Sequence, residues 1–239
     1  MRPLEPAQAA GSDGQPLAPS KRDISNAVPP PPSLHARLKL ETAEAHQRVE
    51  HAFDLAAATS RRDAYASMLA MMHNIYCGIR NELHRLSGNG AYDVARYARL
   101  QIDRLEKDLR ALTVVNRDYR ALSFALGHAD ETIGCEYVMR GSALGGKLIF
   151  KMAADNLGVT ELDGGQFFHG DGRATKSQWS IYSAKLNRLP ADNARFDRII
   201  CGAVKTFGHF EAALSLRNQS PSVSSGLMQD DNHATNPCA

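Results

Sequence analysis

Apolar residues recur every three or four positions along most of the chain, the spacing of helices with one buried face. The pattern predicts helices over Leu34 to about Ala58, Ser60 to about Leu86, Tyr92 to Leu112, Asn116 to Leu126, Glu131 to Asn156, Thr175 to about Leu189, and a last helix ending near Arg217. No stretch alternates apolar and polar residues for long enough to predict a strand. We therefore predict an all-α protein with a single helical domain over residues 34–217.

The two ends of the chain differ from this helical region in composition. Residues 1–33 are rich in Pro, Ala, Gly and Ser and include four consecutive prolines before Ser33. They contain too few apolar residues to offset the entropy lost on folding, so we predict a disordered leader. Residues 218–239 are polar, and we predict a disordered tail.

The predicted helix from Glu131 to Asn156 carries four glycines, at positions 134, 141, 145 and 146. Each glycine inside a helix costs roughly 1 kcal/mol relative to alanine. Gly134, Gly141 and Gly145 share one face, which therefore exposes bare backbone. Two interpretations stay open: another helix packs closely on the small residues, or a wide, flat ligand lies against the backbone.

His46 lies on the apolar face of the first predicted helix. A single histidine in that setting is more often a core residue than a ligand. Glu50, one turn later, could accept the Nδ1 proton and leave Nε2 free as a ligand. Lys39, two turns earlier, could reach an anionic group. Either charged neighbour could equally be a solvated surface residue.

Composition and charge narrow the class of function. The 239 residues are 43% hydrophobic and 23% charged, which suits a globular protein. A net charge of +2 and a pI near 8.4 are too mild to indicate nucleic-acid binding. No apolar run approaches the ~18 residues of a membrane helix, and the N-terminus has no secretory signal. We expect neither nucleic acid nor a membrane as a partner.

The four cysteines are Cys77, Cys135, Cys201 and Cys238, and none forms a CxxC pair. The sequence therefore does not support a zinc or redox motif. The first three lie in apolar helical contexts and are predicted to be buried thiols. A reducing cytoplasm is the simplest compartment for such a chain.

Taken together, two stretches resemble heme oxygenase. Lys39-Leu-Glu-Thr42-Ala-Glu-Ala-His46-Gln-Arg-Val-Glu50 is similar to the family's proximal helix, where Thr, the axial His and Glu follow one turn apart. Gly141-Ser-Ala-Leu-Gly145-Gly146 is similar to the kinked, glycine-rich distal helix on the other heme face. Ser after the first glycine resembles bacterial biliverdin-producing enzymes, often found beside bacteriophytochromes. The resemblance keeps its order over residues 34–217.

The resemblance implies roles for individual residues. His46 would bind the heme iron with Glu50 orienting it, and Gly141, Ser142, Gly145 and Gly146 would form the distal wall. Weaker matches place Tyr76 near the distal waters, Lys39 and Lys185 near the heme propionates, and Thr42, Tyr137 and Phe207 among the heme-binding residues.

The implied reaction is oxidative cleavage of heme to biliverdin, carbon monoxide and ferrous iron. Heme would be both substrate and cofactor, and dioxygen would be the oxidant. The implied partners are an electron donor, either ferredoxin or a flavoprotein reductase, and a bacteriophytochrome that receives biliverdin.

The sequence also departs from the family pattern. Ser142 stands where many members have an Asp that orders waters, and a hydroxyl is a weaker proton-network partner than a carboxylate. Trp179 and Ser183 occupy the two basic positions of the propionate helix. Two other hypotheses therefore stay open: a heme-binding sensor or carrier without turnover, and a helical interaction module without heme.

Overall fold

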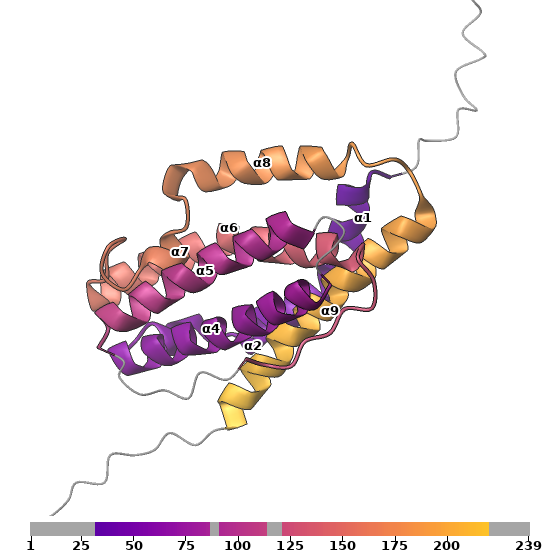
Figure 1. Cartoon of the computed structure of the whole chain (residues 1–239). Helices are drawn as coiled ribbons and strands as arrows, with labels where there is room; N and C mark the ends of the chain where they lie inside the picture. Colours follow the sequence, from indigo (N-terminus) through magenta and orange to yellow (C-terminus); the bar gives the residue numbers. More distant parts are fainter. Residues whose placement is uncertain (1–31, 87–90, 114–120, 220–239) are drawn as a thin grey trace, which may run out of the picture. The chain divides into compact units, whose positions relative to one another are not determined.

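The structure is a computed structural model that describes residues 32–86, 91–113 and 121–219 (Figure 1). Its helices are α1 (Leu34–Glu41), α2 (Ala43–Ala52), α3 (Leu55–Ala58), α4 (Arg62–Arg85), α5 (Ala91–Ala111), α6 (Glu131–Leu157), α7 (Gln166–His169), the 3-10 helix η1 (Gly172–Ala174), α8 (Thr175–Leu186) and α9 (Asn193–Gln219). These residues form no strand, only an isolated bridge between Thr160 and Gly164. The predicted all-α class is confirmed.

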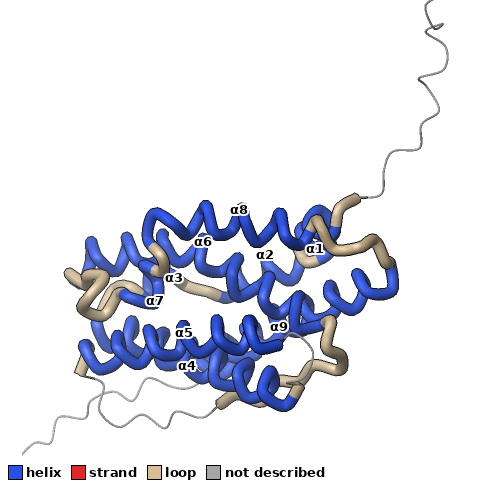
Figure 2. Tube along the Cα trace, turned by 45° about the horizontal axis from the view of Figure 1, so that its top comes forward, coloured by secondary structure: helices blue, strands red, loops and turns tan. Residues whose placement is uncertain are grey.

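Four long helices build the core and position the site. Helix α6 packs along α9, α4 packs along α5, and α2 packs against α9 (Figures 1 and 2). Helix α4 supplies much of the buried apolar surface, with Tyr65, Leu69 and Tyr76 among its fully buried side chains. Within the described ranges, no helix has an apolar run long enough to cross a bilayer. The predicted leader and tail lie outside the description except at residues 32–33 and 218–219.

The helix predicted from Leu34 to about Ala58 is divided into three. Thr42 separates α1 from α2 with φ −104° and ψ 1°, and its buried hydroxyl donates to the Leu38 carbonyl oxygen at 2.7 Å. Asp54 separates α2 from α3, where its side chain accepts a hydrogen bond from the Ala57 amide at 2.9 Å. Thr and Asp side chains bond to nearby backbone and so compete with a continuous helix. The apolar spacing continues across both breaks, so the prediction missed them.

The helix predicted over residues 116–126 is wrong for its described part. Residues 121–126 run beside α4 without helical structure, while residues 116–120 lie outside the description. The Leu122 amide donates to the Asn74 carbonyl, and the Leu126 amide donates to the Glu82 carboxylate. A Cβ on Gly78 would overlap the Leu122 carbonyl oxygen, so this glycine allows the close approach. The segment's hydrogen bonds thus go to α4 instead of forming its own helical turns.

The described thiols are free, but one prediction about them is wrong. Cys77 and Cys135 are buried, as predicted, whereas Cys201 is exposed. The buried face of α9 at this turn is formed by Ile199, Ile200 and Ala203, which leaves Cys201 outside. Cys238 lies outside the described residues.

His209 of α9 is expected to make stability depend on pH. Its buried ring packs on Phe124 at a centroid distance of 4.8 Å, and Nε2 lies 3.3 Å from the Ile75 carbonyl oxygen. Burial lowers the pKa of His209 below its ordinary value of 6.5. As the pH falls, His209 is therefore protonated at a higher pH in the unfolded chain than in the folded one. The stabilisation by neutral His209 is complete above the unfolded pKa and is lost as pH falls through the folded pKa.

Asp108, whose pKa is raised to about 6, has the opposite effect in both proteins. As the pH is lowered from about 7.5 to about 5, we therefore expect the urea unfolding midpoint of His209→Gln to rise relative to that of the wild type. Glutamine can still donate to Ile75 but does not titrate. His73, whose pKa burial also lowers, leaves part of the slope in the variant. Equal slopes in the two proteins would contradict the assignment to His209.

Candidate functional site

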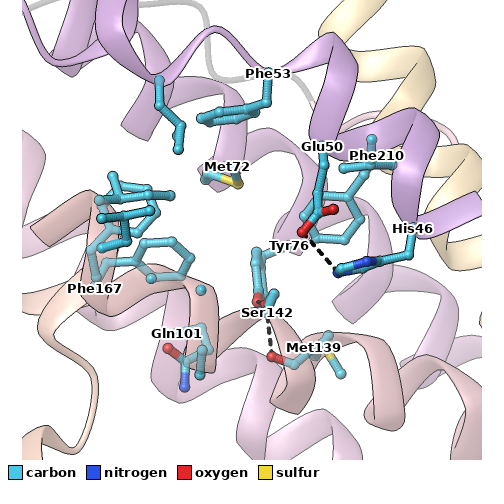
Figure 3. Close-up of a pocket in the computed structure, with 18 of the residues that line it drawn as sticks. His46, Glu50, Phe53, Met72, Tyr76, Gln101, Met139, Ser142, Phe167 and Phe210 are labelled. Atoms are coloured by element: carbon cyan, nitrogen blue, oxygen red, sulfur yellow. Dashed lines mark hydrogen bonds and ion pairs between the residues drawn. The ribbon is translucent and has the colours of Figure 1, made fainter. Parts of the chain in front are cut away.

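A cleft lies between α2 and α6 and consists of two adjoining cavities of about 360 and about 370 Å³. They share the lining residues His46, Val49, Glu50, Ser142 and Phe210. The cavity of about 360 Å³, which we call the inner cavity, continues to residues of α4, α5 and α7 (Figure 3). The cavity of about 370 Å³, which we call the outer cavity, continues to residues of α1 and α8. Both volumes fall within the range of small-molecule sites, and together they can take a ligand larger than either.

His46 projects from α2 into the cleft (Figure 3). The Phe207 ring meets it edge-on at a centroid distance of 5.5 Å, and 55% of the His46 side chain stays exposed, so its ring is available to a ligand. Its Nε2 lies 3.7 Å from Glu50 Oε1, which is within ion-pair range but too long for a hydrogen bond.

The predicted use of the two His46 nitrogens is reversed here. Glu50 was expected beside Nδ1, leaving Nε2 free, but Nε2 is the nitrogen that faces Glu50. A half-turn of the ring about Cβ–Cγ exchanges Nε2 with Cε1 and Nδ1 with Cδ2, and sequence spacing does not distinguish these two ring orientations. The structure does bring the imidazole and the carboxylate together, one turn apart.

The glycines of α6 serve two different purposes. A Cβ on Gly134 would overlap the Ile199 carbonyl oxygen, so Gly134 allows α6 and α9 to pack closely. A Cβ on Gly145 would meet nothing within 4 Å, and one on Gly141 would meet only Trp179, at 3.6 Å. Gly145 lines the inner cavity and Gly141 the outer one. Close helix packing therefore holds at Gly134, while a flat ligand against the backbone at Gly141 and Gly145 stays a prediction.

The rest of the distal motif also lies at the cleft. Gly146 lines the inner cavity, and a Cβ there would lie 3.2 Å from the Phe168 carbonyl oxygen on α7. Helix α6 is assigned as one continuous helix through all these glycines, and the kink expected in it stays a prediction.

Two hydroxyls form a polar point on the wall of the inner cavity. Tyr76 Oη of α4 lies 3.5 Å from Ser142 Oγ of α6, and Ser142 Oγ donates to the Met139 carbonyl oxygen at 2.9 Å (Figure 3). Burial raises the pKa of Tyr76 well above its ordinary value of 10, so its hydroxyl stays protonated at neutral pH. The two residues predicted to act near each other are therefore neighbours.

The outer cavity brings together some of the other predicted residues. Lys39, which is exposed, lines it with Tyr137 and Phe207. Burial raises the pKa of the Tyr137 hydroxyl, while a hydrogen bond with Thr42 opposes that shift. Thr42 is itself buried beneath the wall and lines neither cavity.

Lys185 is not brought to the cleft. It lines two other cavities on α8, together with Asp93, Glu136 and Tyr182. The α8 residue at the outer cavity is Trp179, whose ring lies 5.4 Å from that of Tyr137. Helix α8 therefore presents an aromatic ring to the cleft. Among the described residues that line the cleft, Lys39 is the only lysine or arginine.

Sequence reasoning missed the residues that close the inner cavity at α7. Residues 157–173 lie between two predicted helices and no helix was predicted there, yet α7 forms and places Phe167 and Phe168 in the wall. Asp108 of α5 holds α7, since its two carboxylate oxygens accept from the Gln166 and Phe167 amides, each at 2.7 Å. Burial raises the pKa of Asp108 to about 6. The adjacent Phe167 and Phe168 were the one feature of the sequence that could have indicated this wall. Nothing in the sequence around them links them to Asp108.

The donor set at the cleft bears on the kind of metal it could hold. The described residues contain no group of three or more His, Cys, Asp or Glu side chains able to hold a bare metal ion. His46 offers one imidazole, facing a wall without side chains at Gly145. Such an arrangement suits a metal that brings its own chelating ring and needs one protein ligand.

Comparisons with known proteins show which family and which solved structures the chain is similar to. The heme oxygenase family model matches residues 32–215. A heme oxygenase structure from Leptospira interrogans has 19% identity and a TM-score of 0.61, and the match covers 77% of this chain and 100% of that one. The NO- and CO-bound heme oxygenase from Neisseria meningitidis has 18% identity and a TM-score of 0.60, with 80% and 95% covered.

A third structure, heme oxygenase-1 from the cyanobacterium Synechocystis in complex with heme, has 17% identity and a TM-score of 0.58, with 77% and 92% covered. No curated protein matches the chain. At these identities the solved structures establish the shared all-α fold, while the family model matches most of the sequence. The chain belongs to the heme oxygenase family.

Proposed function

We propose that this chain is an enzyme that cleaves heme to biliverdin, carbon monoxide and ferrous iron, using dioxygen and electrons supplied by another protein. One observation carries the proposal: the cleft has an imidazole, His46, on its α2 wall and bare backbone, at Gly141 and Gly145, on its α6 wall. A flat macrocycle fits between these walls, because its metal needs a ligand on one face and a small reactant needs room on the other.

The other lining residues also fit a heme. Phe207 and Phe210 offer aromatic surface to the faces of a porphyrin, and Val49 adds an aliphatic contact. Lys39 at the outer cavity can pair with a propionate as an ammonium point charge. Among the described residues, the acidic and histidine side chains that line the inner cavity are Glu50 and His46 themselves. The anionic edge of a heme would therefore face Lys39, and its apolar edge would face the inner cavity.

The chain's own residues suggest a division of labour. Bound heme supplies an iron that binds dioxygen and a macrocycle that becomes oxidised. His46, as a neutral imidazole, would hold the iron from α2, and Glu50 would set its orientation. The α6 backbone at Gly145 would leave room for a diatomic molecule and exclude a competing side-chain ligand. The protonated hydroxyls of Tyr76 and Ser142 would pass protons to the reacting face, while Phe167 in the cavity wall would limit access of bulk water.

The experiment that tests this function is a hemin titration followed by turnover in air. We expect a Soret band that saturates at one equivalent, and then a biliverdin spectrum once ascorbate or a ferredoxin system supplies electrons. Decay of the Soret band without biliverdin would contradict the proposal. An unchanged spectrum on adding hemin would favour an interaction module without heme.

A second candidate is a heme sensor or carrier without turnover. It is favoured by Ser142, which replaces a carboxylate beside the first distal glycine. Its mark would be a Soret band that persists under air and electron supply. The proposed partners, a ferredoxin or flavoprotein reductase and a bacteriophytochrome that accepts biliverdin, depend on the turnover result, and the cytoplasmic location stays a prediction.

A further inference from the structure

Gln101 of α5 lines the inner cavity beside Tyr76 and Ser142 but has no role in the function proposed so far (Figure 3). Only 4% of its surface is exposed. Its Nε2 has no hydrogen-bond partner among the described residues. Buried donors without partners are rare because their desolvation is not compensated, so this one calls for a partner that the described residues do not supply.

The orientation of the Gln101 amide is fixed from outside the cavity. Arg104, one turn later on α5, points Nη1 at Gln101 Oε1 at 3.5 Å. Arginine has only donors, so the amide oxygen must face it, and the flipped amide would set two donors against each other. Arg104 is itself held by Asp171, and only 14% of its side chain is exposed. The Nε2 donor is therefore left for a different partner.

Other polar groups around the inner cavity could share that partner. Tyr76 and Ser142 present hydroxyls from α4 and α6. Tyr97 lies one turn before Gln101 on α5 and lines the same cavity. Burial raises the pKa of Tyr97 to about 12, so its hydroxyl also stays protonated at neutral pH. A buried water is held by two to four polar groups, and this wall offers that many.

We propose that Gln101 is a positioning residue for heme cleavage: its Nε2 donates to a water in the inner cavity, and this water joins the Tyr76 and Ser142 hydroxyls into one hydrogen-bond network on the α6 side. An amide does not give up its proton at neutral pH, so Gln101 orders the water while the water and hydroxyls carry protons. The network supplies the ordering that a carboxylate at Ser142 would otherwise provide. The inference rests on the proposed heme site.

The test uses two variants of the full chain loaded with hemin. Gln101→Met has similar length but no donor, and Gln101→Glu keeps an acceptor for Arg104 while replacing the donor with a second acceptor. The first readout is the pH midpoint at which ferric hemin exchanges its bound water for hydroxide. Donation to that ligand favours hydroxide, so the midpoint should rise in Gln101→Met, by roughly one pH unit for a tenfold change, and rise further in Gln101→Glu.

The second readout is the infrared stretching frequency of carbon monoxide on the ferrous complex, which reports donation without turnover. We expect the band to move to higher frequency in Gln101→Met and biliverdin formation to slow. Gln47→Met is the matched control, because Gln47 is exposed on α2 and lines neither cavity. It should leave both readouts at their wild-type values.

The outcomes separate this inference from the function beneath it. If wild-type protein shows no Soret band with hemin, the proposed function fails. If it binds hemin but Gln101→Met leaves both the midpoint and the carbon monoxide band unchanged, the inference is overturned and the heme site stands. Should Gln101→Met not fold, Gln101→Glu decides alone, and wild-type readouts in it would overturn the inference. If wild-type hemin shows no acid–alkaline transition, the carbon monoxide band decides.

Discussion

His46→Ala should abolish turnover and remove the Soret spectrum of imidazole-ligated hemin. The other imidazole that the described residues place at the cleft is His35 of α1, which lines the outer cavity, where its ring packs edge-on against Tyr137 and Trp179. Loss of a residue that only orients a ligand typically costs 10–100-fold in metal affinity or activity, and loss of the ligand itself should cost at least that much. Hemin titration followed at the Soret maximum measures the affinity, and biliverdin absorbance measures the turnover.

His51→Ala is the matched control on the same helix. His51 is exposed, its Nδ1 lies 2.7 Å from the Gln47 carbonyl oxygen, and it lines neither cavity. This variant should bind hemin like the wild type. In His46→Ala, free imidazole should partly restore the spectrum, because the truncated side chain leaves room for it. Wild-type affinity and spectrum in His46→Ala, with far-UV circular dichroism unchanged, would exclude His46 as the ligand.

Gly145→Ala and Gly134→Ala, two identical changes on one helix, should have opposite effects. At Gly145 the added methyl meets no neighbour within 4 Å, so the free energy of unfolding should rise by about 1 kcal/mol through helix propensity alone. The methyl projects at the cleft, however, so hemin affinity should fall, and Gly145→Leu should lower it much further. At Gly134 the methyl overlaps the Ile199 carbonyl, and overpacking should lower the free energy of unfolding by about 1–3 kcal/mol.

Gly208→Ala serves as the control for helix propensity. Gly208 lies in α9, an added Cβ there meets nothing within 4 Å, and the residue lines neither cavity. It should stabilise the apo protein like Gly145→Ala and leave hemin binding unchanged. Urea unfolding without hemin and hemin titration give the two quantities separately. Wild-type hemin affinity in Gly145→Leu would show that nothing lies against this face of α6.

The local features of this protein follow from its sequence alone. Helical spacing predicted the all-α class, and it predicted Glu131 to Asn156 as a helix that the structure extends by one residue, to Leu157. It also put His46 and Glu50 on one side of the first helical region, because residues four apart on a helix are neighbours whatever surrounds them. The order of the two motifs pointed to the family before any distance was known.

Tertiary structure alone decided how the distant parts of the cleft meet. The Asp108 carboxylate that holds α7 lies 59 residues before Phe167, whose amide it binds. In the segment 121–126, which was expected to be helical, the Leu126 amide donates to Glu82 of α4, 44 residues earlier in the chain. The position of Lys185 away from the cleft and the approach of Gln101 to it likewise depend on which faces of α8 and α5 are packed. Periodicity reports which side of a helix is apolar, but not which neighbour covers it. The pairing of polar groups across helices is set only when the core closes, because each group then takes the partner that packing leaves within reach.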